Sequence, residues 1–131
     1  MSKSISGACL CGRVKYRVHG PFLAFHLCHC SQCRRSTGSA HASNIFAEPE
    51  QIEWLAGEEF IKRYTPEEPD VISKCFCTHC GSLVPYTSLS SGKLIIPAGS
   101  LRLPDDNIYW RDRADWYDAG VKAQHIDTEP E

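Results

Sequence analysis

Short stretches in which apolar and polar residues alternate run along most of the chain, a pattern typical of half-buried β-strands. The clearest is Arg13–Val18, where Val14, Tyr16 and Val18 fall on one face. The other predicted strands are Ala40–Ala47, Ile52–Leu55, Phe60–Tyr64, Val71–Phe76, Leu83–Thr87, Leu94–Ile96 and Ile108–Trp110. The pattern therefore predicts a mainly β fold built from several short strands.

Glycine and proline interrupt these stretches often, with nine glycines and eight prolines in 131 residues. Such frequent breakers leave no room for long helices. One short helix is predicted after Cys30, where Ser31 would cap a turn through Gln32–Arg35. We expect residues 1–131 to form a single domain, because most domains have roughly 100–150 residues, and we expect the tail 121–131 to be disordered.

Composition and charge exclude several classes of protein. Hydrophobic residues make up 42% and charged residues 23%, enough for an ordinary core. The net charge is −2 and the basic residues are scattered, which argues against nucleic-acid binding. The first residues lack the apolar run of a signal peptide, and no stretch approaches the ~18 apolar residues of a spanning helix. We expect a cytoplasmic protein with no membrane partner.

The chain also contains eight cysteines, and all of them fall into three short clusters. At about 6% of the chain they lie below the roughly 8–10% of a disulfide scaffold. Clustered cysteines in a reducing cytosol are typical of metal sites or catalytic groups. The clusters are Cys9-Leu10-Cys11-Gly12, Cys28-His29-Cys30-Ser31-Gln32-Cys33 and Cys75-Phe76-Cys77-Thr78-His79-Cys80-Gly81.

Two cysteine pairs are followed directly by glycine and are natural partners in one tetrahedral zinc site. Gly12 and Gly81 would permit the positive φ of a chain that wraps a metal and turns its N–H groups toward sulfur. A structural zinc at this site would stabilise a domain of this size directly. The predicted ligands are Cys9, Cys11, Cys77 and Cys80.

The middle cluster offers three cysteines and no obvious fourth ligand. Three protein ligands with an open position is the catalytic pattern of zinc, so Cys28, Cys30 and Cys33 predict a second, reactive site. A closed structural site is the alternative, completed by one of the candidates His26, His29, His79 or Cys75. The spacing of Cys75 places it instead beside the first site or in the core as a small apolar group.

Arg34 and Arg35 follow the middle cluster immediately. They would either compensate the negative charge of three thiolates on zinc or bind a substrate carboxylate through the planar guanidinium group. The aromatic residues near the C-terminus are by default core or rim residues, although one beside an open zinc would wall a pocket. These residues, with one from the middle of the chain, are Trp54, Tyr109, Trp110, Trp116 and Tyr117.

Over residues 6–117 the chain resembles the glutathione-dependent formaldehyde-activating enzymes, a family that shares its domain with centromere protein V and the wider Mss4-like fold. Three cysteine motifs in the right order carry the resemblance, and three shorter motifs support it. They are Gly7-Ala8-Cys9-Leu10-Cys11-Gly12-Arg13-Val14, Cys28-His29-Cys30-Ser31-Gln32-Cys33-Arg34, Phe76-Cys77-Thr78-His79-Cys80-Gly81-Ser82, Ala98-Gly99-Ser100-Leu101, Ile108-Tyr109 and Trp116-Tyr117.

The resemblance implies several small coiled antiparallel sheets with zinc knuckles and at most short helices. It also implies two zinc ions, a structural one on the four paired cysteines and a second, catalytic one on Cys28, Cys30 and Cys33. The implied activity is that of a carbon–sulfur lyase, which forms S-hydroxymethylglutathione from glutathione and formaldehyde or acts on a related thiol adduct. Arg34 or Arg35 would bind a carboxylate of the glutathione.

Two other functions compete with this expectation. Mss4-like domains also bind small GTPases, so a non-enzymatic, zinc-stabilised module for protein contacts is the first alternative. A redox protein with a CxxC motif is the second, but it would require an unmetallated pair near a βαβ unit, and the pattern predicts no such unit.

Overall fold

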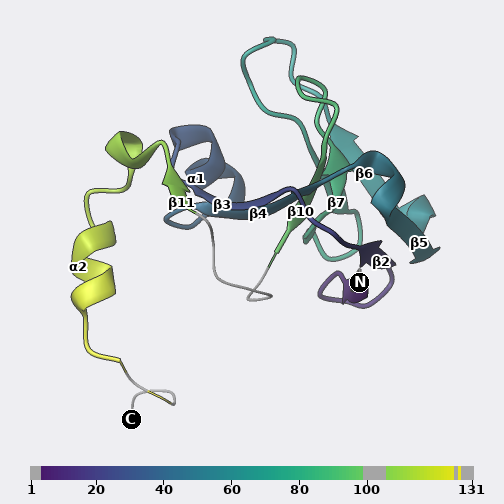
Figure 1. Cartoon of the computed structure of the whole chain (residues 1–131), viewed down its shortest axis with the longest axis horizontal. Coiled ribbons are helices and arrows are strands. Elements are labelled where there is room, and N and C mark those ends of the chain that lie inside the picture. Colours follow the sequence, from purple (N-terminus) through teal and green to yellow (C-terminus); the bar gives the residue numbers. More distant parts are fainter. Residues whose placement is uncertain (1–3, 99–105, 126, 128–131) are drawn as a thin grey trace.

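Three small sheets make up the computed structural model, which describes residues 4–98, 106–125 and 127 (Figure 1). The first sheet has the order β1 (Ser4–Ala8), β2 (Lys15–His19), β5 (Ile52–Ala56). The second has the order β11 (Asp106–Ile108), β3 (Ala24–Cys28), β4 (Ala42–Ala47), β10 (Leu94–Pro97), β9 (Tyr86–Thr87). The third has the order β6 (Ile61–Tyr64), β7 (Lys74–Cys77), β8 (Leu83–Val84).

Neighbouring strands pair antiparallel, except that β11 lies parallel to β3. The helices are short: α1 (Ser31–Thr37), α2 (Tyr117–Lys122) and three single 3₁₀ turns at Pro49–Gln51, Glu58–Phe60 and Trp110–Asp112. The expected mainly β fold of small antiparallel sheets is confirmed. Among the described residues, no helix has both the length and the apolar character needed to cross a membrane.

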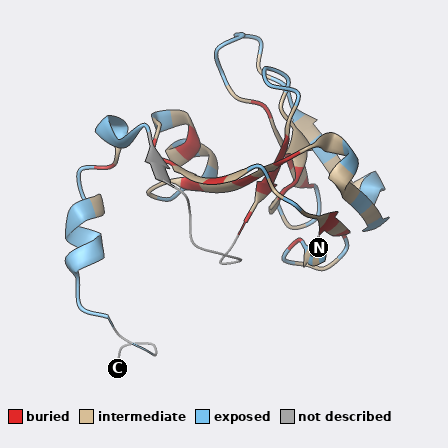
Figure 2. Ribbon diagram, viewed as in Figure 1, coloured by how far each residue is buried: buried red, intermediate tan, exposed pale blue. Residues whose placement is uncertain are grey.

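The core lies where the sheets meet, and the alternating apolar residues in and just before β2 belong to it. Val14, Tyr16 and Val18 are all buried, as the sequence pattern predicts. At Leu94–Ile96 of β10 three consecutive residues are buried, because this strand is covered on both faces (Figure 2). Cys75 also belongs to this core, which confirms its interpretation as a small apolar group.

Several predicted element boundaries were wrong, for identifiable reasons. The stretch Leu83–Thr87 divides at Pro85 into β8 and β9 of different sheets, since proline has no N–H for a ladder. The predicted strand at Ile108–Trp110 ends at Ile108, because Tyr109 has φ 54° and Trp110 begins a 3₁₀ turn. The strand predicted from Val71 begins only at Lys74.

Some elements had no signal in the hydrophobic pattern. β1 has one large apolar residue, Ile5, and His26 interrupts the apolar run of β3. The predicted helix begins at Ser31 and reaches Thr37, but its cap is Cys30 rather than Ser31. Helix α2 reaches Lys122, two residues into the predicted disordered tail; residues 126 and 128–131 of that tail, and residues 99–101 of the Ala-Gly-Ser-Leu motif, lie outside the described residues.

This arrangement places each cysteine cluster at the end of a strand. Cys9 follows β1 directly, Cys28 ends β3 just before α1, and Cys77 ends β7. Strand ends carry short turns instead of long loops here, so the sulfur atoms are held by the sheets themselves. None of the eight cysteines forms a disulfide.

Candidate functional site

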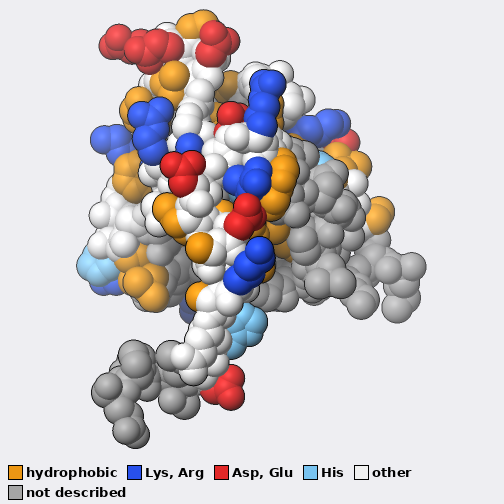
Figure 3. All heavy atoms as spheres, turned by 90° about the vertical axis from the view of Figure 1, so that its left-hand side faces the viewer, with side chains coloured by type: hydrophobic (Ala, Val, Ile, Leu, Met, Phe, Trp, Pro, Cys, Tyr) orange, Lys and Arg blue, Asp and Glu red, His pale blue; other side chains and the backbone are white. Residues whose placement is uncertain are grey.

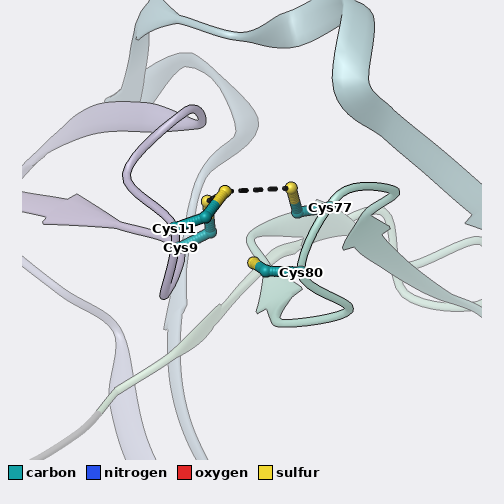
Figure 4. Close-up of side chains that lie close together, drawn as sticks. All are labelled: Cys9, Cys11, Cys77 and Cys80. Atoms are coloured by element: carbon teal, nitrogen blue, oxygen red, sulfur yellow. Dashed lines mark hydrogen bonds between the residues drawn. The ribbon is translucent and has the colours of Figure 1, made fainter.

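Two cysteine pairs far apart in the sequence meet at one point between the first and third sheets (Figure 4). The Sγ atoms of Cys9 and Cys11 lie 3.5 Å apart, and Cys11 Sγ lies 3.9 Å from Cys77 Sγ. Together with Cys80, all four sulfur atoms lie within 4.8 Å of one another. This geometry and donor set fit a tetrahedral zinc ion, because zinc–sulfur bonds of about 2.3 Å place thiolates at such separations.

Two tight turns bring the sulfur atoms into this arrangement. Gly12 has φ 82° and donates its N–H to Cys9 O over 3.0 Å, while Gly81 has φ 79° and donates to Cys77 O over 2.7 Å. A Cβ atom at either glycine would meet nothing within 4 Å. The requirement for glycine is therefore one of backbone conformation, as predicted, and not of space.

Hydrogen bonds lower the pKa values of Cys9 and Cys80 and so favour their thiolate forms, whereas burial raises the pKa of Cys77. The N–H of Val14 donates to Cys9 Sγ over 3.3 Å. A contact of 3.4 Å with Ser82 Oγ, together with the Ser82 backbone, lowers the pKa of Cys80 to about 5. Ser82 Oγ also accepts a hydrogen bond from the N–H of Leu10 over 3.1 Å. Ser82 thus joins the two halves of the site.

The three remaining clustered cysteines meet where β3 leads into α1. Cys28 Sγ lies 3.7 Å from Cys30 Sγ, and all three sulfur atoms lie within 4.8 Å of one another. Cys30 caps α1 by accepting a hydrogen bond from the N–H of Cys33 over 3.4 Å. The helix cap and the sulfur cluster are therefore one structure.

The close approach of Cys28 and Cys33 moves their pKa values in opposite directions. The Cys33 thiol donates a hydrogen bond to the Cys28 sulfur and lowers the pKa of Cys28 to about 6. The same hydrogen bond, together with burial, raises the pKa of Cys33 far above its usual range. Three thiols so close cannot all ionise beside one another, whereas a divalent cation among them would hold all three as thiolates. The donor set fits zinc with one coordination position left over.

Within the described residues, no histidine or carboxylate joins the three sulfur atoms at ligand distance. The candidates for a fourth ligand are engaged or placed elsewhere. Cys75 lies in the core and His79 is exposed. The ring of His26 packs against Phe46, and the fully buried His29 packs its ring against His41, Trp110 and Tyr117.

Two cavities flank the three-cysteine cluster. The helix-side cavity, of about 440 Å³, is lined by Ser31, Gln32, Arg34, Asp70 and Asp112. The sheet-side cavity, of about 340 Å³, is lined by His26, Asn44, Phe46, Lys74 and Tyr86, among others. Both cavities also share four lining residues, namely Cys28, Cys33, Ile72 and Tyr109. The two spaces therefore adjoin at the cluster, and each has the size of a small-molecule site.

The two arginines after the cluster lie in different surroundings. Arg34 lines the helix-side cavity, and its Nε atom is buried without a hydrogen bond to any described residue. Arg35 is exposed and lines neither cavity. Two carboxylates, those of Asp70 and Asp112, share the helix-side cavity with Arg34.

The aromatic residues of the C-terminal segment reach this site as well. Tyr109 walls both cavities, and the rings of Trp110 and Tyr117 pack on His29 at centroid distances of 5.1 and 4.9 Å. Trp116 is exposed. Trp54 packs against Tyr16 in the first sheet and not at the three-cysteine cluster. Figure 3 shows acidic and basic side chains interspersed on the face that carries α2.

Two residues of this site had no role in the sequence analysis. Gln32 donates its amide to Asp70 O over 2.9 Å and accepts from the N–H of Ile72 over 2.8 Å, so it holds the cavity wall onto α1. Its place inside the Cys30–Cys33 motif was the one available signal. Lys74 carried no signal, because only the fold brings β7 beside the cluster.

Comparisons with known proteins bear on the family and the fold of this chain. The sequence profile of the family described as glutathione-dependent formaldehyde-activating enzyme matches residues 4–118. A Halomonas elongata protein, provisionally named as such an enzyme, is 31% identical over 83 residues, which are 60% of this chain and 52% of that protein. The chain thus spans about half the length of this curated relative.

A crystal structure of a Rhodobacter sphaeroides protein matches with a TM-score of 0.59 and 22% identity. The match covers 75% of this chain and 91% of that one, a likeness that shows the fold alone. The residues that match the sequence profile make up most of the chain, and all three cysteine clusters lie among them. The chain therefore belongs to the glutathione-dependent formaldehyde-activating enzyme family.

Proposed function

We propose that this chain is a zinc-dependent carbon–sulfur lyase that forms S-hydroxymethylglutathione from glutathione and formaldehyde, or acts on a related thiol adduct. The observation that carries the proposal is the position of the three-cysteine cluster between two adjoining cavities, with no fourth ligand among the described residues. Family membership supports the same substrates.

Two zinc ions with different roles belong to this proposal. Cys9, Cys11, Cys77 and Cys80 would hold a structural ion, since four sulfur atoms close its coordination sphere. Cys28, Cys30 and Cys33 would hold a catalytic ion with one position open to a substrate thiol. A zinc ion bound there supplies a Lewis acid that favours the thiolate form of a ligand at neutral pH.

In the forward reaction a bond forms between the glutathione sulfur and the formaldehyde carbon, and the π bond of the carbonyl group breaks. The thiol proton ends on the former carbonyl oxygen, so no oxidant or reductant is needed. Tyr109 and Ile72 wall the place where the two cavities adjoin, and they would limit the access of water to the reacting sulfur. Holding both reactants there lowers the entropic part of the barrier.

Arg34 or Arg35 would bind a glutathione carboxylate through a charge-assisted hydrogen bond. Arg34 has the better position, because it lines the helix-side cavity while Arg35 points to no cavity at the cluster. The reaction takes place in the cytoplasm in this proposal, where eight cysteines without a disulfide would stay reduced.

Exchange NMR with ¹³C-formaldehyde and glutathione tests the proposed function, because it measures adduct formation against the spontaneous rate. The zinc-loaded chain is expected to accelerate exchange, and Cys30→Ala to abolish the acceleration while keeping the fold. Cys75→Ala is the matched control, since it removes a core thiol that is no proposed ligand. Full acceleration by Cys30→Ala, or none by the unaltered chain, would refute the proposal.

A further inference from the structure

The two cavities beside the three-cysteine cluster differ in charge. The helix-side cavity combines Arg34 with the carboxylates of Asp70 and Asp112. Of the described residues that line the sheet-side cavity, none is acidic, and Lys74 is the one lysine or arginine. An anionic group would therefore meet charges of both signs on the helix side and, on the sheet side, a cation with no carboxylate among the described lining residues.

Lys74 is also available to a ligand. It lies on β7 and is half-buried, and its ammonium group forms no ion pair or hydrogen bond with the described part of the chain. The other lysine of comparable burial, Lys93, instead pairs with Glu48 over 2.8 Å. The Nζ atom of Lys74 is not among the buried unpartnered atoms of the described residues, so it is accessible to an anion from outside.

Neighbouring polar groups would help to bind such an anion. Ser36 and Asn44 line the same cavity, and their side chains form no hydrogen bond to described residues. Cys28 and Cys33 form part of the wall, so a ligand in this cavity lies directly beside the sulfur cluster. The lining also includes apolar side chains such as Phe46 and Ile95, and apolar surroundings strengthen a charge-assisted bond.

From these observations we propose that the sheet-side cavity is the specificity site of the enzyme and that Lys74 binds a carboxylate of the thiol substrate. The inference rests on the proposed function. This site would favour thiols that carry a carboxylate some distance from the sulfur over uncharged thiols. Glutathione has two carboxylates, so Lys74 and Arg34 would hold opposite ends of one molecule whose sulfur lies at the cluster between them.

The alternative role of Lys74 is charge compensation of the thiolates, and the choice of thiol separates the two roles. Rates of adduct formation are measured by exchange NMR for glutathione and for 2-mercaptoethanol, which has no carboxylate. Lys74→Met is expected to raise KM for glutathione about tenfold or more, the cost of one charge-assisted bond, and to leave the rate with 2-mercaptoethanol within about twofold. Lys74→Arg should restore most of the glutathione affinity.

Lys62→Met is the matched control, because Lys62 lies on the neighbouring strand β6 and is exposed. Equal losses with both thiols, or no loss with either, would overturn the inference. If the unaltered chain acts on neither thiol, the proposed function fails by itself. The cavity is then tested with S-methylglutathione in an amide NMR titration, where shifts around Lys74 that Lys74→Met abolishes support the site and their absence overturns it.

Discussion

The ring of His29 lies 4.9 Å from the ring of Tyr117, centroid to centroid, at an interplanar angle of 82°. His29 is fully buried between Cys28 and Cys30, and Tyr117 is the first residue of α2. The contact therefore fastens the C-terminal segment onto the three-cysteine cluster. His41 and Trp110 complete the group, each in edge-to-face contact with Tyr117 as well.

Replacement of Tyr117 by alanine is expected to destabilise this end of the molecule by about 2 kcal/mol, because three edge-to-face contacts disappear. Thermal unfolding of the zinc-loaded chain measures the change. Trp116→Ala is the control, since Trp116 is adjacent but 59% exposed. Equal effects of the two substitutions would show that the ring group does not hold the segment.

The clamp formed by Gln32 gives a second prediction. Gln32→Ala removes both hydrogen bonds to the backbone of Asp70 and Ile72, at a cost of about 1–2 kcal/mol. The amide of Ile72 should then exchange with solvent at least tenfold faster, as measured by hydrogen-exchange NMR. Ser31→Ala, one position earlier and exposed, should leave this amide unchanged. An unchanged Ile72 amide in Gln32→Ala would contradict the clamp.

Ser82 is expected to tune the four-cysteine site without being a ligand. Ser82→Ala removes the acceptor for the N–H of Leu10 and the hydroxyl beside Cys80 Sγ. Loss of such a supporting bond typically weakens metal binding by about 10–100-fold. Competition with a chromophoric chelator measures the affinity, with Ser91→Ala in an exposed turn as control. An affinity equal to that of the unaltered chain would assign Ser82 no part in the site.

Local chemistry explains how much of this site could be predicted from the sequence. The pairing of Cys9 and Cys11 with Cys77 and Cys80 follows from their spacing and from the glycine after each pair, and the structure brings these residues together. The buried face of β2 follows equally from local alternation.

Long-range placement could not be predicted in this way. Lys74 and Tyr117 reach the cluster only through the packing of β7 beside the second sheet and of α2 beside His29. Helix α2 is six residues long and contains Gly120, so neither its length nor its propensity predicts a helix. The parallel pairing of β11 with β3 likewise depends on contacts distant in sequence.

Native mass spectrometry of the freshly purified chain measures whether the three-cysteine cluster holds zinc with an open position, as proposed. Two zinc ions per chain are expected, with a bound glutathione that appears when the thiol is added. Cys30→Ala should retain one zinc ion, on the four-cysteine site, and bind no glutathione. A single zinc ion in the unaltered chain, or two with no glutathione bound, would show that the three-cysteine cluster is not an open zinc site.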